Sequence, residues 1–386
     1  MFLKKIPLPL MLLLLLGLVL LFGPYIPLTL KSFFLFCSLF LKSILLFVLP
    51  FIIFIYLVTS LTSFEGNILK FIFVLFFAVT VSNFLSTMIA FGLAHQGLPV
   101  VVCQISAGKN ALHPLWTWGF PSLISNEWAL GSGFVAGLIL SLYPSQKILM
   151  LIDRGKHFTA FFLNRIFIPL IPLFVLGFLL KMETEGILWN LIQTYCPIVL
   201  LLMGVYSFYL FFLYWTAAGF SLRQTLNFIK TSFPSGLTGL STMSSAAAMP
   251  LTLKAAEVNS GNPPLVRAII PATVSIHLVG DSIGVPILAM AILGTFGLPL
   301  PDLQTFLIFA GYFIIAKFAI AAVPGGGIIV MIPVLEKYLG FTSEMSGLIT
   351  ALYMLFDPLF TSVNIMGNGA FAVLVSKILG RGKSKA

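Results

Sequence analysis

The sequence predicts an all-α integral membrane protein, and three observations support this fold class. Of the 386 residues, 59% are hydrophobic and only 8% are charged. The mean hydropathy is +1.10. These charged residues are too few to cover a water-soluble globule, and long apolar runs recur along the chain. We therefore expect helices that cross a bilayer, because a helix satisfies its backbone hydrogen bonds internally.

Six apolar runs in the first half each predict a membrane span, since a helix needs about 20 apolar residues to cross the hydrocarbon core. The first run follows Lys4 and Lys5, as in a secretory signal peptide, but no small-x-small cleavage site follows it. We interpret it as a retained span. The six runs are residues 6–23, 33–61, 68–93, 129–143, 158–180 and 191–215.

The distribution of the 21 Lys and Arg residues predicts the topology. Most of them fall at cytoplasmic ends when both termini are placed in the cytoplasm, as the positive-inside rule requires. The net charge of +10 therefore indicates topology and not a nucleic-acid partner. Short loops and the lack of a targeting presequence predict a bacterial inner membrane. Three scattered cysteines predict neither a disulfide framework nor a metal site, and no cofactor is expected.

After residue 225 the apolar pattern is interrupted by Gly, Pro and Ser. Non-helical backbone at membrane depth persists only where protein or a water-filled cavity satisfies its polar groups. We expect two re-entrant hairpins, at about 225–260 and 303–341, which alternate with broken spans at about 264–295 and 343–380.

The two predicted broken spans share a short sequence pattern. His277-Leu-Val-Gly-Asp281 and Asn364-Ile-Met-Gly-Asn368 both have a polar residue, two apolar residues, Gly and then Asp or Asn. Paired interruptions of this kind in two halves of a chain indicate the binding site of a transporter. Asp281 and Asp357 also lie in apolar segments, where a carboxylate costs at least about 2.5 kcal/mol and usually marks a substrate or ion path.

Three motifs carry a resemblance to a known family. They are Ser244-Ser245-Ala-Ala-Ala-Met-Pro250-Leu-Thr, Pro324-Gly-Gly-Gly327, and the series Asp357, Thr361, Val363-Asn364, Gly367. With them the chain resembles the dicarboxylate/amino acid:cation symporter family, from about residue 33 to 380. The match is specific in the second half and diffuse in the first.

The resemblance implies a homotrimer of subunits with eight spans, two re-entrant hairpins and inverted repeats, working by an elevator motion. Residues 1–223 would form the scaffold, with span 3 and part of span 6 joining the transport domain. Residues 224–380 would form that transport domain, and residues 381–386 a basic cytoplasmic tail. The implied partners are an amino acid or dicarboxylate, H+ or Na+, and membrane lipids.

By the same resemblance, Asp357 binds the substrate ammonium and Asn364 its α-carboxylate. The arginine that captures a side-chain carboxylate in acidic-amino-acid members is here Phe360, which predicts a neutral amino acid as substrate, because an aromatic ring cannot replace the bidentate guanidinium. Three structural alternatives stay open: a helix cap at Asp357, backbone satisfaction by the hairpin serines, and a lipid-facing Phe360. The expected substrate-binding residues are Ser244, Ser245, Val323, Pro324, Gly325, Gly326, Asp357, Phe360, Thr361 and Asn364.

The cation-binding positions depart from the family. Its Asn-Met-Asp-Gly-Thr signature aligns with His277-Leu-Val-Gly-Asp281, so Val279 replaces one carboxylate, and Asn368 replaces another. Histidine changes charge near neutral pH, and intramembrane Asp, Glu and His commonly relay protons. Two possibilities follow. Transport is proton-coupled through His277 and Asp281. Alternatively, these two residues form a structural hydrogen bond, and transport either uses a residual sodium site or is uncoupled. The expected coupling residues are Ser275, His277, Asp281, Asn364 and Asn368.

Other functions compete with this prediction. The sequence contains no His-Glu-x-x-His motif, so we do not expect an enzyme. The alternatives are a sodium-coupled symporter of dicarboxylates or acidic amino acids, and an uncoupled relative that acts as an anion channel or a structural trimer.

Overall fold

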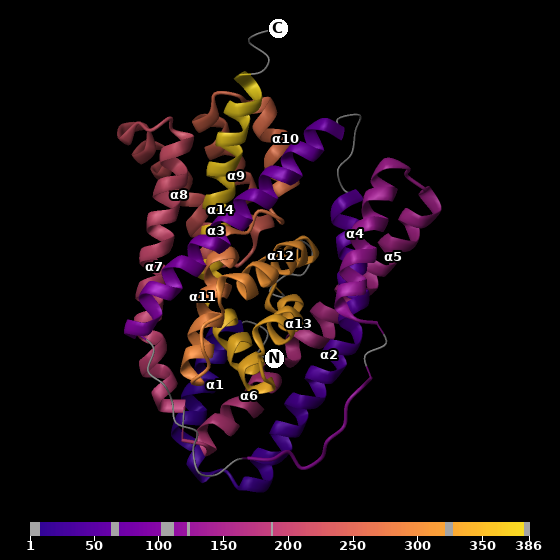
Figure 1. Cartoon of the computed structure of the whole chain (residues 1–386), viewed down its shortest axis with the longest axis vertical. Coiled ribbons are helices and arrows are strands. Elements are labelled where there is room, and N and C mark those ends of the chain that lie inside the picture. The colour runs from indigo at the N-terminus through magenta and orange to yellow at the C-terminus, as the bar shows by residue number, and fades with distance from the viewer. Residues whose placement is uncertain are drawn as a thin grey trace. The chain divides into compact units, whose positions relative to one another are not determined.

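The computed structural model describes residues 8–62, 69–101, 112–121, 124–186, 188–320 and 327–381. All regular elements in these ranges are helices (Figure 1), as the sequence predicts. The α-helices are α1 (Leu8–Phe22), α2 (Leu28–Thr62), α3 (Leu69–Val101), α4 (Asn126–Leu142), α5 (Gln146–Phe161), α6 (Ile168–Thr184), α7 (Leu188–Ala217), α8 (Leu222–Thr242), α9 (Ser245–Ser260), α10 (Pro263–Thr273), α11 (Val279–Thr295), α12 (Leu303–Ile320), α13 (Gly327–Leu339) and α14 (Ser343–Arg381).

The helices form two compact units, each assembled from three separate stretches of chain. The first unit comprises residues 1–62, 93–199 and 288–356. The second unit comprises residues 63–92, 200–287 and 357–386. Four helices, α3, α7, α11 and α14, therefore contribute residues to both units.

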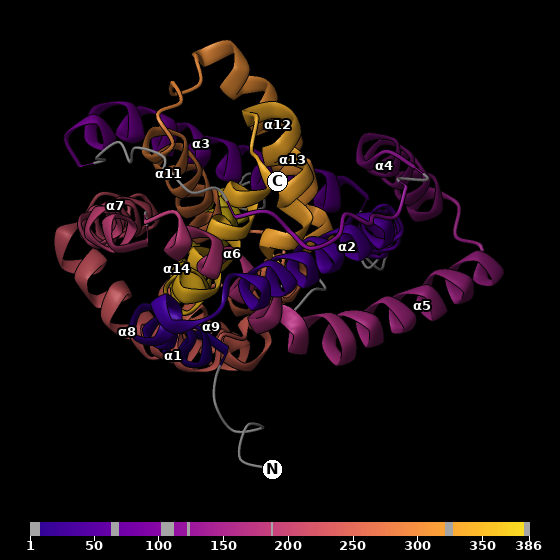
Figure 2. The same ribbon diagram turned by 90° about the horizontal axis from the view of Figure 1, so that it is seen from below.

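In the first unit, α2 contacts α4, α5, α6, α12 and α13. Figure 2 shows α5 running along α2. α2 and α6 approach closely at Gly177, where a Cβ would overlap the Phe34 carbonyl oxygen and the Ser38 hydroxyl. α12 and α13, which lie within the residues of the predicted second hairpin, pack against each other. Two buried lysines of this unit form ion pairs, Lys31 with Glu183 at 2.6 Å and Lys42 with Glu336 at 2.5 Å.

In the second unit, α8 and α9 pack as the predicted first hairpin. The chain reverses at Met243, which adopts a left-handed conformation with φ of 52°. α8 approaches the second half of α14 through two glycines. A Cβ at Gly236 would lie 2.6 Å from the Met366 sulfur, and a Cβ at Gly239 would overlap Ile365.

Several helices are suited to a bilayer. Among the described residues, four helices are long and apolar enough to cross a membrane, and a fifth span is present if Gln146–Phe167 and Pro169–Thr184, which meet at a 50° bend, count as one. The chain is thus a multi-pass integral membrane protein. The number of eight spans stays a prediction.

The structure shows the expected interruption in one of the two predicted broken spans and contradicts it in the other. The helix pair α10 and α11 is interrupted at residues 274–278. α14, by contrast, is one unbroken helix of 39 residues with Pro358 inside it. At about 1.5 Å per residue it measures roughly 58 Å, well beyond the roughly 30 Å of a hydrocarbon core.

Candidate functional site

The break between α10 and α11 exposes backbone groups that lack helical partners, and one side chain of α3 satisfies two of them. The Asn83 Nδ2 donates to the Ile276 carbonyl at 2.9 Å. The Asn83 Oδ1 accepts from the Leu278 N–H at 3.2 Å. Asn83 is fully buried. Since an unpaired buried backbone group is costly, Asn83 stabilises the interruption.

A second amide, from α14, satisfies the N-terminus of α11. The Asn364 Oδ1 accepts from the Gly280 N–H at 2.7 Å and from the Asp281 N–H at 3.4 Å. The Asn364 Nδ2 donates to Asp281 Oδ2. The Asp281 carboxylate, 3% exposed, therefore lies in the first turn of α11, where the helix dipole favours a negative charge.

α11 and α14 cross at glycines in antiparallel sense. A Cβ at Gly280 would overlap the Phe360 carbonyl oxygen, and a Cβ at Gly367 would overlap the Val279 side chain. The Tyr206 hydroxyl of α7 donates to the Gly280 carbonyl at 2.8 Å. The glycines of the repeated five-residue pattern thus serve the close approach of two helices.

His277 lies within the break and contacts two other helices. Its Nε2 is 2.8 Å from the Ser82 hydroxyl of α3. Its ring stacks on Phe371 of α14 at 4.2 Å between centroids. The Asp281 carboxylate accepts a hydrogen bond from Asn364 of α14. The two residues lie on the same short stretch of chain but are held by different helices.

Two further predicted coupling residues flank the break. Ser275 lies inside it and is half-buried. Asn368 is fully buried, and its Oδ1 accepts from the Thr273 hydroxyl at 2.7 Å, while its Nδ2 has no hydrogen-bond partner. The structure therefore brings Asn368 to the end of α10, opposite the interruption.

The predicted substrate residues of α14 continue along the same helix. The Thr361 hydroxyl donates to Asp357 Oδ1 at 3.4 Å. Asp357 lies in the interior of α14, which excludes the alternative of a helix cap. Phe360 is fully buried and meets the Tyr206 ring edge to face at 6.1 Å. Its complete burial in the second unit excludes a lipid-facing position.

The hairpin residues are only partly described. Ser244 is the N-cap of α9, where its hydroxyl accepts from the Ala247 N–H at 3.3 Å. This bond agrees with the alternative that the serine satisfies hairpin backbone. Ser245 follows it and is half-buried. The α8 arm of this hairpin reaches α14, since a Cβ at Gly239 would lie 3.4 Å from the Thr361 carbonyl oxygen. Val323, Pro324, Gly325 and Gly326 lie outside the described residues.

Sequence reasoning missed three residues of this site, namely Ser82, Asn83 and Tyr206. A signal was present, because buried polar residues recur on α3 at helical spacing: Asn83, Ser86 and Thr87. Such a polar stripe in an apolar helix indicates a face that contacts protein.

The second unit therefore gathers two aspartates, a histidine and three asparagines around one interrupted helix. Residues 130–378 match the sodium:dicarboxylate symporter family. The chain belongs to this family. Members of the sodium:dicarboxylate symporter family are transporters and not enzymes, and the resemblance predicted from the motifs is confirmed.

Several amino acid transporters are similar to this chain. The serine/threonine transporter SstT of Acinetobacter baumannii is 25% identical over 250 residues, which cover 64% of this chain and 60% of the relative. The proton/sodium-glutamate symport protein of Geobacillus stearothermophilus is 26% identical over 190 residues, which cover 48% and 44%. Excitatory amino acid transporter 2 of Homo sapiens is 27% identical over 154 residues, which cover 40% and 26%.

Proposed function

We propose that this protein is a cation-coupled symporter of a small neutral amino acid. Phe360 carries the proposal, because this buried aromatic residue occupies the position at which acidic-amino-acid transporters place the arginine for a side-chain carboxylate. A hydrocarbon ring offers no partner for that charge. The similarity to a transporter named for serine and threonine supports a neutral substrate. The glutamate relatives support the competing acidic substrate.

In this proposal Asp357 accepts the substrate ammonium and Asn364 meets the α-carboxylate. Asn364 Oδ1 already serves the α11 N-terminus and one Nδ2 hydrogen serves Asp281. A primary amide has a second Nδ2 hydrogen, which a substrate carboxylate can accept. Ser244, Ser245 and Thr361 complete the proposed site, and residues 323–326 stay expected substrate-binding residues by resemblance to the family.

Coupling to protons through His277 and Asp281 is the form of transport that we favour. Val279 and Asn368 stand where the family has carboxylates, and a small hard cation needs several oxygen ligands with charge to offset its dehydration. His277 and Asp281 are buried, titratable and anchored by hydrogen bonds to other helices. The competing form is sodium coupling through the remaining oxygens of the break.

The wider architecture of the family completes the proposal. The protein would act as a homotrimer in a bacterial inner membrane with both termini in the cytoplasm. Residues 224–380 would move as an elevator against a scaffold of residues 1–223. An uncoupled anion channel or a structural trimer would keep the same helices without saturable uptake.

Uptake by proteoliposomes tests the substrate. Radiolabelled serine, alanine, leucine and glutamate are offered in turn, with inward sodium and proton gradients imposed separately. We expect saturable uptake of a neutral amino acid that excess glutamate does not inhibit. Asp357→Ala should abolish it, whereas Asp153→Ala, an exposed aspartate of α5, should not. Glutamate uptake that survives in Asp357→Ala would contradict both the substrate and the residue assignment.

A further inference from the structure

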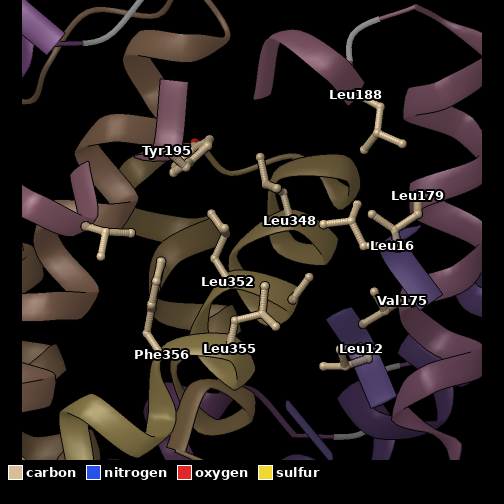
Figure 3. Close-up of a pocket in the computed structure, with 12 residues that line it drawn as sticks. Leu12, Leu16, Val175, Leu179, Leu188, Tyr195, Leu348, Leu352, Leu355 and Phe356 are labelled. Carbon is tan, nitrogen blue, oxygen red and sulfur yellow. The ribbon is translucent and has the colours of Figure 1, made fainter. Parts of the chain in front are cut away.

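The first unit contains a cavity of about 300 Å³ that the site described above does not use. It lies between α1, α6, α7 and the first half of α14 (Figure 3). Leu16 of α1, Leu179 of α6, and Leu352 and Phe356 of α14 face it in the close-up. All the lining residues belong to the first unit.

The lining of the cavity is apolar. Its residues are Leu, Val, Ala, Phe and a single Tyr, so the only polar side-chain atom is the Tyr195 hydroxyl. That hydroxyl is 3.4 Å from the Thr295 hydroxyl, and it is therefore already engaged by protein. Water needs several polar partners to occupy a cavity, and a cavity lined by Leu and Phe stays dry.

The cavity is large beside the voids of protein interiors, few of which exceed the size of a water molecule. It has about twice the volume of an engineered cavity of roughly 150 Å³ that binds benzene. A hydrocarbon ligand would make dispersion contacts with the lining atoms. The cavity thus has the size and chemistry for a hydrocarbon ligand.

The surface beside the cavity indicates where that hydrocarbon comes from. α1 presents Leu14 and Leu18 outward, with 52% and 53% of their surface exposed, on either side of the lining residue Leu16. Leu16 itself is half-buried, so the lining reaches the surface of the unit. In a membrane protein an exposed leucine face of this kind lies against lipid tails.

We propose that this cavity is a lipid site which takes an acyl chain of a phospholipid from the surrounding bilayer. The acyl chain enters past α1 and lies against α14. The last lining residue, Phe356, directly precedes Asp357 in α14, so the bound chain contacts the helix that carries the proposed substrate residues.

Photolabelling tests this site without any measurement of transport. The full chain is reconstituted in phosphatidylcholine vesicles that contain a phosphatidylcholine with a diazirine on one acyl chain. After irradiation, labelled peptides are identified by mass spectrometry. Exposed Leu200 of α7 provides the reference for ordinary contact with lipid. We expect residues 348–356 to carry label at a level comparable with that reference.

Two variants that fill the cavity from opposite sides sharpen the test. Leu16→Trp and Ala351→Phe should each reduce labelling of residues 348–356 several-fold, whereas Leu18→Trp, which changes the outward face, should leave it at the wild-type level. Size-exclusion chromatography verifies that the variants are folded. Absence of label at residues 348–356, or equal labelling in wild type and both filling variants, overturns the proposal. A third outcome is that residues 348–356 are protected from the lipid label and that Leu16→Trp changes the oligomeric state. This outcome would identify a second copy of the protein as the occupant of the cavity and would also overturn the proposal.

Discussion

At the scale of single residues, the side-chain amides of Asn83 and Asn364 replace the backbone partners that an unbroken helix would supply. Asn83 serves the Ile276 carbonyl and the Leu278 N–H, and Asn364 serves the amides of Gly280 and Asp281. A break at membrane depth is stable only when such partners are present. These two asparagines thus stabilise the interruption of the helix without any contribution from substrate.

Replacing Asn83 tests this role. Asn83→Leu keeps the size of the side chain but leaves two buried backbone groups without partners, at about 1–3 kcal/mol each. We expect a markedly lower unfolding temperature of the detergent-solubilised protein. Thr87→Val on the same helix, which removes a hydroxyl bonded to the Asn83 carbonyl, should have a smaller effect. Equal effects of the two variants would refute the bridging role of Asn83.

Gly280 offers a second residue-scale prediction, because the Phe360 carbonyl oxygen occupies the place of its missing Cβ. Gly280→Ala forces α11 and α14 apart, which should cost about 1–3 kcal/mol as overpacking does and should impair substrate binding. Gly369→Ala is the control, since its Cβ would lie 3.5 Å from Thr252, an ordinary contact. Thermal unfolding and substrate binding are measured for both variants. An unaffected Gly280→Ala would show that the two helices are not held at this distance.

At the scale of elements, the five-residue pattern shared by residues 277–281 and 364–368 occurs in two different backbone settings. Residues 277–281 begin a helix after a break, whereas residues 364–368 lie within a continuous one. The glycines at 280 and 367 pack against the partner helix in both cases. Packing between helices, and not the interruption, explains the similarity of the two segments.

The start of α12 supplies a prediction about pH. The Thr305 N–H donates to Asp302 Oδ1 at 2.8 Å, and this backbone hydrogen bond lowers the pKa of Asp302 from its ordinary value of 3.8. A lowered pKa in the folded state contributes stability above the unfolded pKa, and that stability is lost as the pH falls through the folded value. Asp302 acts here as the N-cap of the helix.

We therefore expect Asp302→Ala to lower the unfolding temperature near neutral pH, with a difference from wild type that shrinks below about pH 4, where the carboxylate is protonated. Asp302→Asn should stay close to wild type near neutral pH, because Asn is an equally good N-cap. A difference between Asp302→Ala and wild type that is independent of pH would mean that the ionised carboxylate contributes nothing to the cap.

At the scale of the whole molecule, each compact unit is assembled from segments distant in sequence. The second unit joins the first two-thirds of α3 to α8, α9, α10 and the second half of α14. The division into a scaffold of residues 1–223 and a transport domain of residues 224–380 stays a prediction.

Proton coupling is a property of the whole transporter and can be measured on it. In proteoliposomes, an inward proton gradient should drive uptake in wild type without sodium. His277→Gln should lose this stimulation, because glutamine keeps a hydrogen-bonding group but does not titrate. His157→Gln is the control, since His157 is exposed on α5. Uptake that requires sodium and ignores the proton gradient would end the hypothesis of coupling through His277.

The sequence by itself determined the all-helical membrane class and the interruption near His277. These features depend on local composition, since apolar runs set the spans and Gly, Pro and Ser interrupt them. Only the tertiary structure decided that α14 continues unbroken. It also decided that Asn83, nearly two hundred residues before the break between α10 and α11, hydrogen-bonds the free backbone groups of that break. Side chains that satisfy a broken backbone come from whichever helix folds beside it, and that proximity is a property of packing, which no local pattern contains.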